Sequence, residues 1–189
     1  MLQSLANALL KLFGWNVIKG LPDFDKYVLI GAPHTSNWDF FVGMTAALAI
    51  GLRFKWLAKH TIFKNPLGPI LKFFGGIPVD RRVRSSVIEK MTNLFNTSEQ
   101  LVLGITPEGT RSKTEYWKSG FYYIALNAKV PVAFAYLDYG NKKIGIGDHF
   151  IPSGDINADM QIIKNFYSDL KGKRPENQGE IRLRPREND

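Results

Sequence analysis

The run Lys26–Ala32 constrains the fold of this 189-residue chain more than any other feature. Its centre, Tyr-Val-Leu-Ile, is apolar at four successive positions, which is typical of a strand buried on both faces in a parallel sheet. A polar turn follows at once, and then a second apolar segment, residues 38–50, that is long enough for a helix. We therefore expect a strand, a turn and a helix in direct succession.

The same succession recurs along the chain. Further strands are predicted at residues 54–58, 77–80, 100–106, 130–139, 142–146 and 180–183. Further helices are predicted at residues 2–13, 85–96, 120–128 and 157–171, with a short one ending at Phe74. This alternation predicts a single α/β domain with a largely parallel or mixed central sheet flanked by helices.

The N-terminal segment has its own pattern. Leu2, Leu5 and Leu9 recur at helical spacing, so we expect residues 1–15 to form an amphipathic helix and residues 16–189 to form the main domain. Since no apolar run approaches the 18 or so residues that a membrane span needs, we expect contact with a membrane to be peripheral.

The net charge of +8 is concentrated in one stretch. Residues 53–84 carry eight lysines and arginines against a single acidic residue, Asp80. Such an excess indicates nucleic acid, an anionic membrane or a phosphorylated substrate as partner, although solvated surfaces without a ligand also carry it. The chain has no cysteine, which excludes disulfides, thiolate metal sites and a cysteine nucleophile.

The turn after the first buried strand holds a histidine and an aspartate. Sheets of this class place their active sites at the carboxyl ends of strands. His34 lies at such an end, and Asp39 follows five positions later, where the next helix begins. A carboxylate on one imidazole nitrogen leaves the other free to act as a base toward a hydroxyl. The alternative is that His34 merely caps the helix.

Two later turns carry arginines and glycines. Gly75 and Gly76 precede the short strand 77–80, which Arg81 and Arg82 follow, and an arginine fork suits phosphate oxygens. Residues 107–112 read Pro-Glu-Gly-Thr-Arg-Ser, in which the glycine lets backbone donors approach an anion. Taken alone, the first is an ordinary surface arginine pair and the second a simple turn.

Together these turns resemble the glycerolipid acyltransferase superfamily, whose best-known members acylate lysophosphatidic acid. The similarity extends over residues 27–139, and four blocks in order carry it. The blocks are His34-Thr-Ser-Asn-Trp-Asp39, Gly76-Ile-Pro-Val-Asp-Arg81, Pro107-Glu-Gly-Thr-Arg-Ser112 and Val130-Pro-Val132. The resemblance implies a glycerol-3-phosphate acyltransferase-like fold and makes residues 16–189 the acyltransferase domain.

The resemblance also implies roles for single residues. His34 is expected to deprotonate the acceptor hydroxyl, and Asp39 to orient it. The implied substrate-binding residues, which would hold the phosphate and glycerol of a lysophospholipid, are Ser36, Arg81, Glu108, Gly109, Thr110 and Arg111. The expected donor is an acyl-ACP or acyl-CoA thioester, with no metal and no other cofactor. We expect the protein to lie peripherally on the cytoplasmic face of an anionic membrane and to bind no nucleic acid.

Two alternatives remain open. One is the same chemistry on a lysolipid acceptor without a phosphate, such as a lyso-aminolipid. The other is a non-catalytic basic module that binds nucleic acid or an anionic membrane. That module would use the charge of residues 53–84 but has no use for a His34–Asp39 pair.

Overall fold

The computed structural model describes residues 1–18, 20–80 and 84–184. Within these residues, seven strands form one sheet in the order β1-β7-β6-β2-β5-β3-β4. The strands are β1 (Asn16–Ile18), β2 (Lys26–Ala32), β3 (Lys55–Lys59), β4 (Gly76–Val79), β5 (Leu101–Ile105), β6 (Val132–Asp138) and β7 (Lys143–Phe150). The helices are α1 (Leu2–Leu12), α2 (Trp38–Ile50), α3 (Gly68–Phe73), α4 (Arg84–Thr97), α5 (Gly120–Ala128) and α6 (Ile156–Tyr167), with 3₁₀ turns η1 (His60–Lys64) and η2 (Pro175–Asn177).

The central strand is β2, which pairs in parallel with both β5 and β6. β6 and β7 form the antiparallel hairpin expected across Gly140 and Asn141, so the sheet is mixed. The predicted α/β fold with a central sheet is therefore confirmed.

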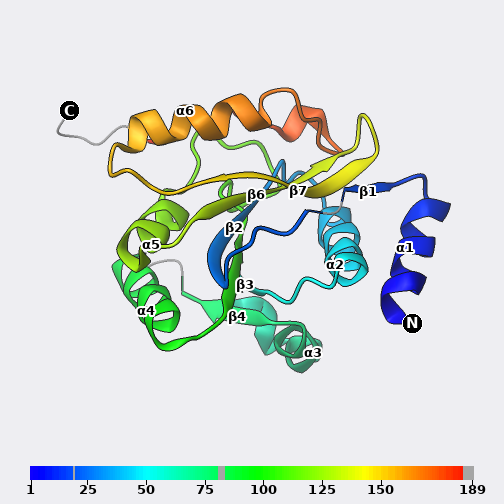
Figure 1. The fold of residues 1–189 in the computed structure, drawn as a ribbon, viewed down its shortest axis with the longest axis horizontal. Helices are drawn as coiled ribbons and strands as arrows, with labels where there is room; N and C mark the ends of the chain where they lie inside the picture. The colour runs from blue at the N-terminus through cyan, green and yellow to red at the C-terminus, as the bar shows by residue number, and fades with distance from the viewer. Residues whose placement is uncertain (19, 81–83, 185–189) are drawn as a thin grey trace.

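Helices cover both faces of the sheet (Figure 1). Val28 and Ile30 of β2 point into the larger core, to which α4, α5 and α6 contribute. Tyr27 and Leu29 point to the opposite face, over which α2 lies. This alternation explains why the strand is apolar at every central position: both of its faces are buried.

Helix α1 packs mainly on α2 and also contacts the edge strand β1. Its buried residues, Ala6 and Leu10, join Ala46 and Ala49 of α2 in a small core cluster. The other leucines of α1, and Phe13 after it, are exposed, namely Leu2, Leu5, Leu9, Leu12 and Phe13. Division of the chain at residue 15 stays a prediction. No helix in the described ranges is both long and apolar enough to cross a bilayer.

Three sequence expectations were wrong in detail. The strand predicted at residues 180–183 is only an isolated bridge between Leu183 and Trp117. Strand β1 was missed, because its three residues are too few to show alternation. Helix α6 ends at Tyr167 and not at residue 171, because the chain turns away so that the carbonyl of Lys171 accepts the N–H of Tyr139 at 2.8 Å.

Candidate active site

Two of the three candidate turns meet at one edge of the sheet. β2 and β5 are adjacent and parallel, with Ile30 opposite Ile105, so the turns that follow them lie side by side. The backbone N–H of His34 donates to Oε1 of Glu108 at 2.9 Å, which joins the first and third sequence blocks. Strand β4 is separated from β5 by β3, and Arg81, which follows β4 in the sequence, lies outside the described residues.

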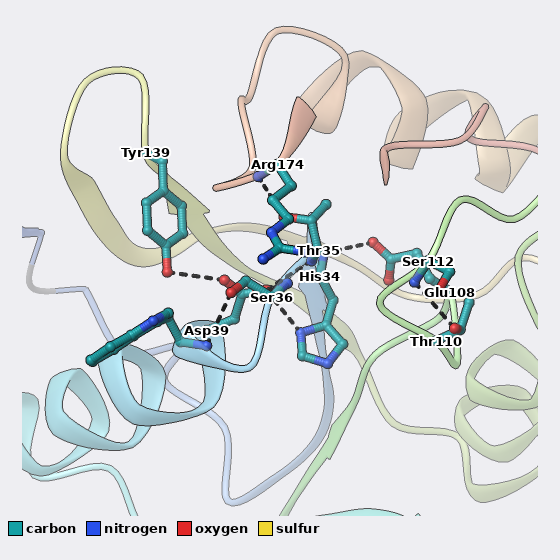
Figure 2. Close-up of polar contacts among 10 residues, drawn as sticks. His34, Thr35, Ser36, Asp39, Glu108, Thr110, Ser112, Tyr139 and Arg174 are labelled. Atoms are coloured by element: carbon teal, nitrogen blue, oxygen red, sulfur yellow. Dashed lines mark hydrogen bonds and ion pairs between the residues drawn. The ribbon is translucent and has the colours of Figure 1, made fainter. Parts of the chain in front are cut away.

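His34 and Asp39 form a contact pair (Figure 2). Nδ1 of His34 lies 3.1 Å from Oδ2 of Asp39, which stands on the first turn of α2. The backbone N–H groups of Thr35 and Ser36 donate to the same oxygen, each at 2.8 Å. The turn between them therefore closes around the carboxylate, as the five-residue spacing predicted.

The environment of Asp39 keeps it ionised. Burial on its own would raise the pKa of this carboxyl group. The hydrogen bond with His34, the N–H of Ser36 and the hydroxyl of Tyr139 outweigh burial and bring the pKa of Asp39 below its ordinary value. An ionised Asp39 fixes the proton of the imidazole on Nδ1 and leaves Nε2 as an acceptor.

An apolar cavity of about 250 Å³ lies between α2 and the sheet and reaches this pair. Its wall includes Leu29 and Gly31 of β2, Gly43 and Ala47 of α2, and then His34 beyond the end of β2. The cavity therefore runs along the strands toward their carboxyl ends. A hydrocarbon chain is the kind of group that such a lining accommodates.

The predicted substrate-binding residues are distributed around this edge. Arg111 lines the cavity together with His34 and Asp39. Thr110 is exposed, and its hydroxyl accepts the N–H of Ser112 at 3.2 Å. Ser36 is buried, and its hydroxyl accepts the N–H of Trp38 at 3.2 Å, at the start of α2.

Gly109 makes the turn of the third block possible. Its φ of +66° lies in the left-handed region that favours glycine, and its N–H donates to the carbonyl of Thr106 at 3.0 Å. This closes the turn directly after Glu108.

Glu108 lies behind His34. Burial raises its pKa to about 7, which hydrogen bonding with the N–H of His34 only partly offsets. Its other oxygen, Oε2, is buried and has no hydrogen-bond partner among the described residues. Glu108 lines a separate cavity of about 90 Å³, together with Trp117 and Tyr167. Glu108 thus holds the turn through the N–H of His34 and does not line the larger cavity.

Two residues of the site were not foreseen. The hydroxyl of Tyr139 donates to Oδ1 of Asp39 at 3.0 Å, and the N–H of Arg174 donates to the hydroxyl of Thr35 at 3.2 Å. These partners are 100 and 139 positions apart in the chain, and no local pattern in the sequence connects them.

In the part of the chain that the structure describes, no group of three or more histidine and carboxylate side chains could hold a metal ion. A site that needs no metal stays a prediction.

Comparison with known proteins agrees with this geometry. The model of the Acyltransferase family matches residues 18–136. No curated protein matches the chain. A solved structure with a similar fold is the 1-acyl-sn-glycerophosphate (LPA) acyltransferase, PlsC, from Thermotoga maritima. It is 16% identical, the alignment covers 89% of this chain and 77% of that chain, and the TM-score is 0.57. Since the family match spans well over half of the sequence, the chain belongs to the acyltransferase family.

Proposed function

We propose that this chain transfers a fatty acyl group from an acyl-ACP or acyl-CoA thioester to the hydroxyl of a lysophospholipid such as 1-acylglycerol-3-phosphate. The observation that carries the proposal is the 3.1 Å contact between His34 Nδ1 and Asp39 Oδ2 in the wall of an apolar cavity. Membership of the acyltransferase family supports the reaction type. The similar fold of PlsC, which is an LPA acyltransferase, supports this class of acceptor.

The proposed step begins at Nε2 of His34. This nitrogen takes the hydroxyl proton while the acceptor oxygen attacks the thioester carbonyl carbon. The tetrahedral intermediate collapses, the C–S bond breaks, and His34 returns the proton to the departing sulfur, which leaves an ester and a free thiol. Asp39 stabilises the imidazolium that exists between the two proton transfers. The step needs only side chains and the two substrates, so we propose no cofactor.

The acyl chain is assigned to the 250 Å³ cavity. Gly43 of α2 lines it, and a Cβ atom at this position would have no neighbouring heavy atom within 4 Å. A larger side chain at Gly43 has room to enter the cavity and shorten the space for a hydrocarbon.

Gly43→Leu is therefore expected to discriminate against long acyl chains. Each methylene that no longer fits costs about 1–3 kcal/mol, so kcat/KM for long-chain donors should fall roughly 10–100-fold relative to short-chain donors. Thiol release with donors of graded length measures this ratio, and Gly43→Ala, which adds one carbon, provides the graded control. Equal losses for all donor lengths would remove the acyl chain from this cavity.

The acceptor phosphate is assigned to Arg111, which lines the same cavity, and to Arg81, which the resemblance implies. The test is thiol release with both donor types across lysolipids with and without a phosphate, using wild type and Arg111→Ala. Release that requires a lysophospholipid and is weakened by Arg111→Ala supports the proposal. A phosphate-free acceptor used equally well by both proteins would favour the lyso-aminolipid alternative. Salt-sensitive binding of nucleic acid without any thiol release would favour the basic module.

A membrane is the proposed second partner, because acceptor and product are lipids. Two exposed apolar segments are available for contact, α1 and the region of α3. The second consists of Leu67, Ile70, Phe73 and Phe74, with Lys64 and Lys72 beside them in sequence. Exposed apolar groups next to lysines suit an anionic leaflet, such as the cytoplasmic one, which we propose as the place of action.

Replacing Leu5, Leu12 and Phe13 together by serine is expected to weaken vesicle binding roughly 10–100-fold. These side chains are exposed, so the contact of α1 with α2 remains. Each buried apolar side chain is worth about 1.5–3 kcal/mol, of which partial insertion recovers a fraction. Sedimentation with anionic phosphatidylglycerol vesicles at low and high salt measures the change. The control replaces Ile151 and Ile162, which are also exposed but lie after β7 and on α6. No binding by the wild type, or equal loss in both variants, would contradict docking through α1.

A further inference from the structure

The carboxylate of Asp39 is held from two sides. Three donors meet on Oδ2, all from the turn that precedes α2: His34 Nδ1 at 3.1 Å and the N–H groups of Thr35 and Ser36 at 2.8 Å. The donor to Oδ1 is the hydroxyl of Tyr139, at 3.0 Å, from a different part of the fold. Donors on opposite oxygens fix the rotation of the carboxylate, and with it the direction from which Oδ2 meets the imidazole.

Tyr139 is itself held firmly. It follows β6 in the turn to β7, where Oδ1 of Asp138 accepts the N–H of Gly140 at 3.0 Å. Its own N–H donates to the carbonyl of Lys171 at 2.8 Å. Its ring packs edge to face on the buried Trp15, with the ring centroids 4.8 Å apart. These contacts fix the position of the Tyr139 hydroxyl relative to Asp39. A side chain that orients a catalytic group needs such support from its surroundings.

The hydroxyl remains a donor under working conditions. Burial, followed by the charge of Asp39, raises the pKa of Tyr139 well above its ordinary value. A hydrogen bond to a charged group contributes about 1.5–3 kcal/mol, more than a neutral pair. The wall of the large cavity on β6 consists of Ala135, Tyr136 and Leu137, and Tyr139 lies beyond it.

We propose that Tyr139 is a positioning residue for acyl transfer: it acts through Asp39 and contacts neither substrate. The proposal rests on the proposed function and adds a residue outside the stretch that matches the family model.

The first test is Tyr139→Phe, which removes the hydroxyl and keeps the ring on Trp15. We expect kcat to fall roughly 10–100-fold, the equivalent of the lost hydrogen bond, with KM for both substrates within about two-fold of wild type. Tyr122→Phe is the matched control, because the hydroxyl of Tyr122 donates to another buried aspartate, Asp159, at 2.8 Å. The control should lose stability but keep its kcat. Wild-type kcat in Tyr139→Phe, or an equal loss in Tyr122→Phe, would overturn the proposal.

A double-mutant cycle separates positioning from a general structural effect. If Tyr139 acts through Asp39, adding Tyr139→Phe to Asp39→Asn should lower kcat no further. A fully additive loss would mean that Tyr139 does not act through Asp39. A normal kcat in Asp39→Asn itself would instead overturn the proposed function.

A spectroscopic measurement tests the geometry without any turnover. The Nδ1 proton of His34, assigned by its absence in His34→Ala, should change its NMR shift in Tyr139→Phe and not in Tyr122→Phe. An unchanged resonance in Tyr139→Phe would overturn the proposal even if the natural substrates were others.

Discussion

His34→Ala is expected to lower kcat for acyl transfer by roughly 10²–10⁴-fold, the contribution of a positioned general base. In the proposed step, the imidazole of His34, which lines the cavity, accepts the hydroxyl proton and returns it to the leaving sulfur. The fold should survive, because the N–H of residue 34 can still donate to Glu108, and Thr35 and Ser36 still hold Asp39. Thiol release under steady-state and single-turnover conditions measures the loss.

His149→Ala is the matched control for this substitution. His149 lies on β7, where its ring packs against Phe24, and it does not line the cavity with His34. Its replacement should leave kcat at the wild-type value. Circular dichroism and the melting temperature establish that both variants are folded. A folded His34→Ala enzyme that turns over at the wild-type rate would exclude His34 as the base.

The parts of the site that the sequence predicts are those governed by local geometry. Asp39 folds back on His34 because five residues span one tight turn between a strand and a helix. His34 and Glu108 meet because each follows a strand of a parallel pair, and such strands end at the same edge. Both relations depend on spacing and secondary structure alone, which a sequence displays directly.

The remaining contacts depend on tertiary packing. Tyr139 reaches Asp39 only because β6 lies next to β2, and Arg174 reaches Thr35 only because the chain after α6 returns across the site. No spacing rule connects residues that are 100 or more positions apart. The surroundings of Glu108 are of the same kind, because the smaller cavity that it lines also includes residues from distant parts of the chain, such as Tyr167 and Gln178.

Tertiary packing also determines which side chains of the N-terminal helix are buried. Its leucine pattern predicted an apolar face but not the partner of that face. Alanines at positions 6, 46 and 49 let α1 approach α2 closely, so only a narrow stripe is covered and the larger apolar residues remain outside. The same helix ends next to Trp15, whose ring supports Tyr139. The cluster that anchors α1 on α2 therefore also supports the side chain that fixes Asp39.

Asp39→Asn is expected to lower kcat by roughly 10²–10⁴-fold while the protein remains folded. An amide cannot offer an acceptor at every contact of the carboxylate. If its oxygen faces the N–H groups of Thr35 and Ser36, its NH₂ group occupies the other position, where the hydroxyl of Tyr139 must turn to accept. If the amide is reversed, its NH₂ group faces Nδ1 of His34 and moves the imidazole proton to Nε2, the nitrogen that must be free to act as base.

The control for Asp39→Asn is Asp159→Asn. Asp159 is also buried at the start of a helix, and it accepts a tyrosine hydroxyl and the N–H of Ser153, but it lies on α6 away from the cavity. It should lose stability without losing kcat. If both variants lost kcat equally, the effect of Asp39 would be structural and its role in orienting the base would be wrong.

The stability of Asp39→Asn should depend on pH in a defined direction. The pKa of Asp39 is lowered in the folded protein, so its ionised form contributes stability above the unfolded pKa of about 3.9. That contribution is lost as the pH falls through the lower folded pKa. The gap in unfolding free energy between wild type and Asp39→Asn should therefore be constant near neutral pH and shrink below about pH 4. Urea unfolding at about pH 7, 5 and 3 measures it. A gap that stays unchanged at the lowest pH would show that the charge of Asp39 does not stabilise the turn, and the loss of kcat would then need another cause.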